Sequence, residues 1–160
     1  MEILIPIEPK AQARPRVCVR GKFAHAYKTP EQEANEKTLE TYLKEYVPDH
    51  PLEGPVELIF TAALPIPISA SKKRQAAMME GRELPTKRPD LSNLCKQIED
   101  AMTRLQFFRD DSQITSLKCC KIYQSKGFWQ IIIKKGDLND QIDAKTAGVQ
   151  GKLSYEAASA

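Results

Sequence analysis

The chain has 160 residues, of which 41% are hydrophobic and 28% charged, and its formal net charge at pH 7 is +3. This size and composition are typical of one soluble globular domain, and no apolar run approaches the roughly 20 residues that span a bilayer, so a membrane protein is not expected. The opening sequence, MEILIPIEPK, has an early acid and no basic segment, which does not fit a secretory signal peptide, and a cytoplasmic location is predicted.

The first predicted elements are a strand, a loop and a helix. Residues 1–7, MEILIPI, predict a short strand. Residues 10–30 combine prolines and a glycine with basic and aromatic residues, which indicates a loop or a loose hairpin. Thr29, followed by a proline and then by Gln32 at the third helical position, is typical of a capped helix start. This helix is expected to run to about Tyr46.

A second strand and a second helix follow. The apolar stretch PVELIFTAALPIPI, residues 55–68, predicts a strand that ends at its prolines. Ser71 is the expected N-cap of a helix that continues to about Glu80, with three basic residues in its first turn. Cations at a helix N-terminus oppose the helix dipole, so these charges either serve another purpose or are simply exposed.

The third predicted helix carries the strongest periodicity in the sequence. From Leu91 onward, apolar residues recur at i, i+3, i+4 and i+7, which indicates a helix with one buried face. Residues 114–124 and 127–135 then predict two strands of a hairpin. We therefore expect a single α+β domain over residues 1–135, with a mixed sheet of about four strands and two or three helices packed on it. Residues 136–160 are predicted to form a polar, mobile tail.

An unusual set of polar residues accompanies this third helix. Asp90 lies at its predicted start, and the pair Asp110 and Asp111 precedes the next strand. If the helix packs on the sheet, these acids can return close to it. Carboxylates with one lysine suit Mg²⁺ and phosphate chemistry, because they combine hard oxygen ligands with a point positive charge. The helix side opposite the apolar stripe carries Asn93, Lys96 and Asp100.

Ordinary structural roles compete with this interpretation. Asp90 is also where a plain N-cap belongs, and two consecutive aspartates are common in a turn before a strand. Lys96 and Asp100 have the spacing of a surface ion pair on a helix. With two histidines, both distant from the acids, a Ser-His hydrolase or a His-metal nuclease is disfavoured. No phosphate-binding loop or dinucleotide motif occurs, so no nucleotide cofactor is expected.

Basic residues are concentrated in two segments. Residues 1–29 and 71–89 each contain six Lys or Arg against two acids. Such segregation favours a face that binds a polyanion, with a solvated surface as the alternative. The four cysteines contain no Cys-x-x-Cys pair, so buried thiols are predicted and a zinc site is not. The candidate phosphate contacts are Arg14, Arg16, Arg20, Lys22, Lys72, Lys73, Arg74, Lys87 and Arg88.

Two segments at a fixed separation carry a resemblance to a known family. RPDLSNLCKQIEDAM followed by FFRDDSQI resembles the RusA family of Holliday junction resolvases, whose approximate pattern is K/R-P-D-x-D-N-L-x-K followed by D-D-x-Q-I/V. The early ARPR and YKTP segments are similar to the N-terminal part of that family. The resemblance covers residues 1–135 and implies a RusA-like fold.

The resemblance also implies an activity and roles for individual residues. Members of the family are small homodimeric endonucleases, often encoded by phages or prophages, that cut four-way DNA junctions by paired incisions using Mg²⁺, for which Mn²⁺ can substitute. By motif position, Asp90 and Asp111 would hold the metal and Lys96 would contact the scissile phosphate. Asp100 and Asp110 match acids of the pattern with outer or structural roles. Branched DNA and a second copy of the chain are the expected partners.

One position departs from the family pattern. Ser92 stands where the pattern has its second aspartate, so a weak, uncharged ligand replaces a carboxylate in the expected metal site. Either Asp100 or Asp110 supplies the missing charge, or metal affinity falls. The alternative function is therefore a weakly active or inactive protein that binds junctions without cutting them.

Overall fold

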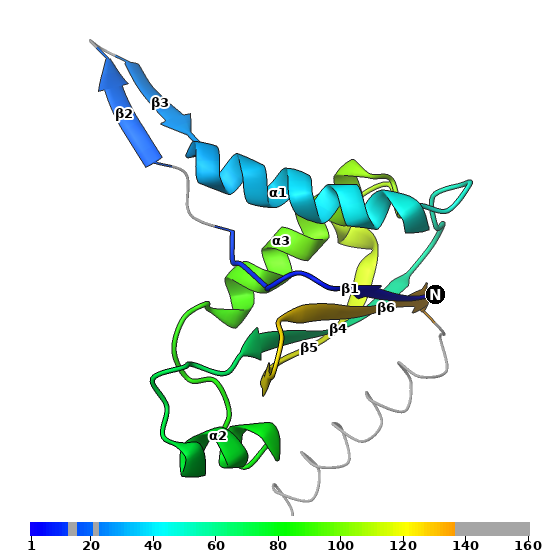
Figure 1. The fold of residues 1–160 in the computed structure, drawn as a ribbon. Helices are drawn as coiled ribbons and strands as arrows, with labels where there is room; N and C mark the ends of the chain where they lie inside the picture. Colours follow the sequence, from blue (N-terminus) through cyan, green and yellow to red (C-terminus); the bar gives the residue numbers. More distant parts are fainter. Residues whose placement is uncertain (13–15, 21–22, 137–160) are drawn as a thin grey trace, which may run out of the picture.

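The computed structural model describes residues 1–12, 16–20 and 23–136, and within these ranges it contains six strands, three α-helices and two short 3₁₀ helices (Figure 1). This confirms the predicted α+β class. The strands are β1 (Glu2–Ile5), β2 (Arg16–Arg20), β3 (Phe23–Tyr27), β4 (Val56–Pro65), β5 (Ile114–Gln124) and β6 (Phe128–Lys135). The helices are α1 (Pro30–Leu43), η1 (Lys44–Tyr46), α2 (Lys72–Met79), α3 (Leu91–Arg104) and η2 (Asp111–Gln113).

Four strands form a mixed sheet in the order β1-β6-β4-β5, while β2 and β3 form a separate hairpin. The predicted hairpin of residues 114–124 and 127–135 is wrong, because β4 lies between β5 and β6 and pairs with both, parallel to β5 and antiparallel to β6. The physical reason lies in the composition of β4. A strand that is apolar on both faces is most stable in the interior of a sheet, whereas β5 carries polar residues suited to an edge.

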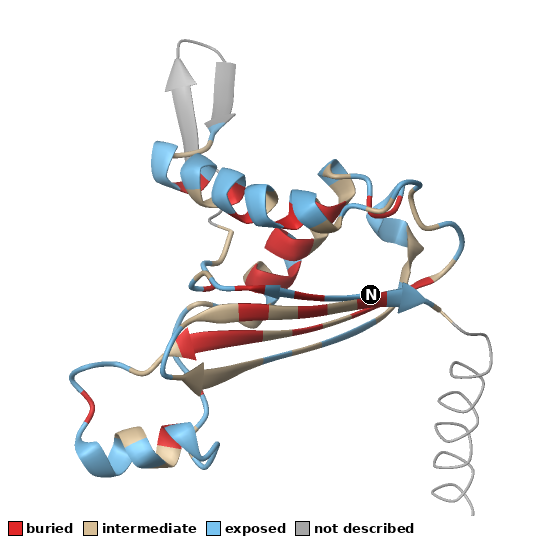
Figure 2. Cartoon of the chain, turned by 45° about the vertical axis from the view of Figure 1, so that its right-hand side comes forward, coloured by how far each residue is buried: buried red, intermediate tan, exposed pale blue. Residues whose placement is uncertain are grey.

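Helices α1 and α3 cover one face of this sheet, and the hydrophobic core lies between the helices and the sheet (Figure 2). Phe60 of β4 and Trp129 of β6 meet edge to face, with ring centroids 5.8 Å apart. From α3, Leu94, Ile98 and Met102 are fully buried, as its periodicity predicted. No helix among the described residues is long and apolar enough to cross a membrane.

The three α-helices begin at the predicted residues but are capped differently. Thr29 Oγ1 accepts a hydrogen bond from the backbone N–H of Gln32 at 3.3 Å, which confirms the predicted cap of α1. Ser71 and Asp90 occupy the N-cap positions of α2 and α3, yet neither side chain accepts a hydrogen bond from a backbone N–H of the first turn of its helix. The carboxylate of Asp90 therefore contributes no capping hydrogen bond.

The buried-thiol prediction holds for one of the described cysteines. Cys95 of α3 is buried, and burial, followed by the neighbouring Cys119, raises the pKa of its thiol to about 12. The two sulfur atoms lie 3.3 Å apart, linking α3 to β5. Cys120, by contrast, is exposed on the other face of β5.

A buried acid on the opposite face of the sheet joins three strands. Because Leu58 and Phe60 face the helices, Glu57 points the other way, and its carboxylate accepts from Lys118 of β5 at 3.0 Å and from Lys134 of β6 at 2.8 Å. Hydrogen bonds from Lys134 and then Lys118 hold the pKa of Glu57 below its ordinary value of about 4.5.

We expect Glu57→Gln to lower the free energy of unfolding by about 1 kcal/mol at neutral pH. Since the folded-state pKa of Glu57 is depressed, its contribution is fully present above the unfolded-state pKa and is lost as pH falls through the folded-state pKa. Urea unfolding at several pH values measures this difference, which should shrink toward zero below about pH 4. Glu45→Gln, at an exposed residue, is the control. A difference independent of pH would contradict the ion-pair explanation.

Candidate functional site

The turn that leads into α3 is tied to the sheet by a lysine that the sequence analysis did not select. Lys121 of β5 donates from Nζ to the backbone carbonyls of Lys87 at 2.8 Å and Pro89 at 3.0 Å. Because Asp90 follows directly, these two bonds determine where its carboxylate stands relative to the sheet. The sequence signal that could have identified Lys121 is its position on the helix-facing side of an edge strand. A lysine ammonium in that position needs hydrogen-bond acceptors.

A cleft of about 800 Å³ opens at the start of α3. The exposed carboxylate of Asp90 lies in it, and its Oδ2 accepts a hydrogen bond from the side-chain amide of Asn93 at 3.5 Å. The N-cap interpretation of Asp90 is therefore right about position and wrong about the bond. The cleft is lined by Glu8, Pro9, Lys10, Ala11, Gln12, Arg88, Pro89, Asp90 and Asn93.

Gln12 connects the N-terminal segment to α3. Its backbone N–H donates to the carbonyl of Asn93 at 3.3 Å, and its Nε2 donates to Oδ2 of Asp100 at 2.8 Å. The Oε1 atom of Gln12 is buried and has no hydrogen-bond partner among the described residues. The competing interpretation of Lys96 and Asp100 as an ion pair is wrong for the described structure, in which Asp100 accepts from Gln12 and forms no ion pair with Lys96. Lys96 is exposed and pairs with no acid in the described part of the chain.

The two aspartates after α3 have different structural roles. Asp110 is the N-cap of η2, and its Oδ1 accepts from the backbone N–H of Ser112 at 2.9 Å. Hydrogen bonds from Ser112 lower the pKa of Asp110. Asp110 is thus a turn residue, as the competing interpretation held. Asp111 is exposed, and within the described ranges its side chain engages only Asp110, whose pKa it helps to lower.

The side chain of Gln113 holds this turn in place. Its Oε1 accepts from the backbone N–H groups of Arg109 at 2.8 Å and Asp110 at 3.2 Å. Its Nε2 donates to the carbonyls of Leu52 at 3.0 Å and Gly54 at 2.9 Å. The glutamine of the D-D-x-Q motif therefore positions Asp111 by joining its turn to the loop before β4.

Glu99 is an acidic residue near the site that the sequence analysis missed. Its pKa is raised mainly by partial burial, then by the negative charges of Asp111 and Asp100. Asp111 therefore lies close enough to the middle of α3 to act on Glu99. The available signal was spacing, since Glu99 is seven residues after Ser92 and three after Lys96, which returns it to the same side of the helix.

The expected metal ligands, Asp90, Ser92 and Asp111, are all exposed and offer only oxygen donors, which suits Mg²⁺. Asp90 and Ser92 lie at the start of α3, whereas the charge of Asp111 affects the pKa of Glu99 in the second half of the helix. Within the described ranges, no three His, Cys, Asp or Glu side chains gather into a metal-binding group. The donor chemistry fits a hard cation, and the ligand set remains a prediction.

The candidate phosphate contacts are only partly described. Lys72, Lys73, Lys87 and Arg88 are exposed. Arg74 is exposed but donates to Glu83, with Nε at 3.2 Å from Oε2. The positions Arg14 and Lys22 lie outside the described residues, and for Arg16 and Arg20 the structure describes only the backbone of β2.

Known proteins resemble the chain over nearly all of the described domain. The family described as Endodeoxyribonuclease RusA matches residues 6–134, which include α1, α2, α3 and both acidic segments. The chain belongs to the RusA endodeoxyribonuclease family. This confirms the resemblance predicted from the motifs.

Two curated relatives agree with the assignment to the RusA family. An "Uncharacterized protein YqaN" of Bacillus subtilis (strain 168) is 29% identical over 130 residues, which is 80% of this chain and 91% of that protein. A "Crossover junction endodeoxyribonuclease rusA" of Lactococcus phage r1t is 46% identical over 48 residues, which is 30% of this chain and 37% of the phage protein.

We expect Gln113→Ala to lower the free energy of unfolding by about 2 kcal/mol, because four hydrogen bonds to backbone groups are lost. Amide hydrogen exchange of residues 109–114 should accelerate more than that of α1. Lys126→Ala, at an exposed residue between β5 and β6, is the control. Equal stability of the two variants would show that Gln113 does not hold the turn.

We also expect Glu99→Gln to stabilise the protein at neutral pH. The folded-state pKa of Glu99 is raised, so ionising this carboxyl lowers the free energy of unfolding. The stability of the protein is therefore fully present below the unfolded-state pKa of Glu99, and part of it is lost as pH rises through the folded-state pKa. The gain from glutamine should therefore appear as pH rises and vanish below about pH 4. Thermal unfolding across pH measures it.

A carbon-detected NMR titration of the Glu99 carboxyl provides an independent check. Asp111→Asn should lower the pKa of Glu99, because a neighbouring negative charge is removed. An unchanged pKa would place Asp111 outside the electrostatic reach of α3.

Proposed function

We propose that this RusA family member is a divalent-metal-dependent endonuclease that cuts four-way junctions and other branched DNA by paired incisions. The observation that carries the proposal is the family match over residues 6–134. The motif residues expected to do chemistry, Asp90, Lys96 and Asp111, are also exposed and are not engaged in the bonds that hold the fold together. The acids that do serve the structure, Asp100 and Asp110, are bonded to Gln12 and Ser112.

Asp90 and Asp111 would hold Mg²⁺, or Mn²⁺ in its place, with the hydroxyl of Ser92 as a weaker donor. When bound, such an ion supplies Lewis-acid stabilisation of the phosphate and a more acidic bound water. Lys96 would stand opposite the nonbridging phosphate oxygens and offset the negative charge that develops on them. Attack of water in line with the leaving 3′ oxygen would produce 5′-phosphate ends.

Substitution of the expected second aspartate by Ser92 weakens this site but does not leave it without negative charge. Glu99 lies near both Asp111 and Asp100, because the negative charges of these two residues contribute to its raised pKa. A cation near this helix would therefore gain from their field. This supports a working enzyme despite Ser92.

One observation favours a second candidate, a protein that binds junctions without cutting them. Among the described residues no three acids, histidines or cysteines form a metal-binding group, which would follow if Ser92 had removed a required ligand. This candidate uses the same DNA surface and differs only in chemistry.

Paired incisions require two active sites, and a homodimer would supply them. A four-way junction has near twofold symmetry, which an isologous pair of subunits matches. The exposed cations Lys72, Lys73, Lys87 and Arg88 would contact the phosphates of the junction arms. Binding of branched DNA should accordingly weaken steeply as salt concentration rises.

We expect cleavage of a labelled four-way junction by the full chain in Mg²⁺ or Mn²⁺, with 5′-phosphate products. Asp111→Asn should lower the rate at least about 100-fold through loss of a ligand, whereas Glu31→Gln, an exposed control on α1, should cut normally. Ser92→Asp separates the two candidates. Cleavage by Ser92→Asp but not by the wild type would establish the binding protein, and no cleavage by either would contradict the enzyme.

A further inference from the structure

The loop between β4 and α2 presents an unusually exposed apolar side chain. Ile68 is 99% exposed, the most of any large hydrophobic residue in the described ranges. The loop is nevertheless anchored at several points. The N–H of Ile66 donates to the carbonyl of Gln124 at 3.0 Å, the N–H of Ala70 donates to the carbonyl of Pro67 at 3.0 Å, and Nε2 of Gln75 donates to the carbonyl of Ala70 at 2.7 Å. A constrained loop therefore holds Ile68 out in solvent.

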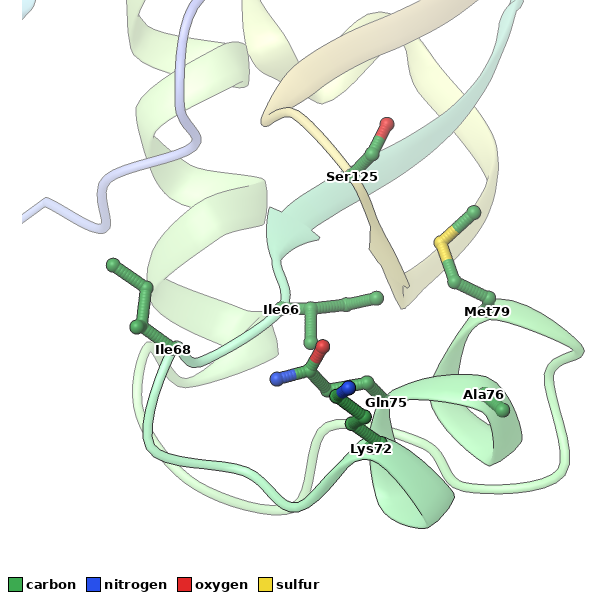
Figure 3. Close-up of a pocket in the computed structure, with 7 residues that line it drawn as sticks. All are labelled: Ile66, Ile68, Lys72, Gln75, Ala76, Met79 and Ser125. Carbon is green, nitrogen blue, oxygen red and sulfur yellow. The ribbon is translucent and has the colours of Figure 1, made fainter.

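Ile68 lies at one side of a pocket of about 580 Å³ (Figure 3). Met79 of α2 lies on the other side, and Ile66, Gln75 and Lys72 lie between them. Apolar groups thus line the pocket together with an amide, the hydroxyl of Ser125 and one ammonium group. A nucleotide complements these groups. Its flat base faces suit the apolar side chains, its polar base edges suit the amide and the hydroxyl, and its phosphate suits the ammonium group.

The charges around the pocket favour a polyanion over an apolar protein segment. Lys72 and Lys73 are exposed and form no ion pair with any described residue. The neighbouring arginines differ, since Arg74 pairs with Glu83 and Arg82 pairs with Glu80. Two lysines beside the pocket are therefore available for phosphates.

The pocket lies at the same end of the sheet as Asp90. Lys121, which bonds to the carbonyl of Pro89, is four residues before Ser125, which lines the pocket. Four residues of extended chain span about 13 Å. This corresponds to about four base-pair steps at 3.4 Å per step, so one DNA arm could reach both places.

We propose that this pocket receives an unstacked base from the branch point of bound DNA, with Ile68 wedged against the base pair left behind. Apolar wedges of this kind unstack base steps in other DNA-bending proteins, and aromatic bases gain from apolar contact. Lys72 and Lys73 contact the phosphates that flank the unstacked nucleotide. The inference rests on the proposed function, because it specifies how branched DNA is distorted beside the same site.

A fluorescent base tests the proposal without any cleavage. Four-way junctions with 2-aminopurine at successive positions around the branch point are mixed with the full-length protein in metal-free buffer. We expect wild type to increase the fluorescence severalfold at one or two positions, Ile68→Ser to lose most of this increase, and Ile68→Leu to retain it. Leu4→Ser, at another exposed apolar residue that is 58% accessible, should behave like wild type.

A cleavage comparison separates base opening from a loss of folding or binding. Ile68→Ser should cut a fully paired junction about 10-fold more slowly than wild type, yet cut a junction with unpaired bases at its centre at the wild-type rate. The two proteins should also have the same melting temperature, since Ile68 makes little contact with the rest of the fold.

Equal fluorescence for wild type and Ile68→Ser, or equally slow cutting of both substrates by Ile68→Ser, would overturn the proposal. A change in oligomeric state of Ile68→Ser without a change in fluorescence would overturn it too, by assigning the surface to a protein contact. If wild type cuts no junction, the proposed nuclease function fails, and the metal-free fluorescence still decides the wedge. If wild type does not bind branched DNA, both fail.

Discussion

The central position of β4 is the constraint on which the rest of this fold depends. Its residues are mostly apolar and are buried on both faces, so burial is most favourable when β4 has a neighbour on each side, β5 in parallel and β6 antiparallel. The parallel pairing brings the ends of β4 and β5 together, and Lys121 near the end of β5 then holds the turn before Asp90. The start of α3 and the loop that carries Ile68 consequently lie at one end of the sheet.

Hydrogen bonding divides the polar residues of the acidic segments into two groups. Asp100 and Asp110 are occupied by Gln12 and by the backbone of Ser112, and they stabilise the arrangement of α3 and η2. Asp90 and Asp111 carry no comparable bonds. Side chains that a fold leaves unengaged are available to bind metal and substrate. The pKa of Glu99, which is raised first by partial burial and then by the charges of Asp111 and Asp100, places further negative charge near Asp111.

A nuclease for branched DNA has to bind phosphates and also distort the branch point. Under the proposed function, the exposed cations Lys72 and Lys73 of α2 and Lys87 and Arg88 before α3 would serve the first need. A constrained apolar side chain beside a pocket suits the second, because unstacking a base costs less when its faces find new apolar contacts. The pocket beside Ile68 and the start of α3 lie at one end of the sheet, so the proposed DNA distortion and the proposed chemistry involve the same surface.

The sequence by itself determined the local structure and the family. The local structure follows from short-range interactions, because the period of α3, the cap at Thr29 and the apolar run of β4 depend on neighbouring residues. The family follows from the two acidic motifs and their spacing, which are also read directly from the sequence. Only the tertiary structure decided that β4 separates β5 from β6 and that Asp110 caps a turn while Asp111 does not. It also decided that Glu99, Gln12 and Lys121 lie beside the candidate site residues. These outcomes depend on contacts between residues far apart in the chain, such as Gln12 with Asp100, which no local pattern encodes.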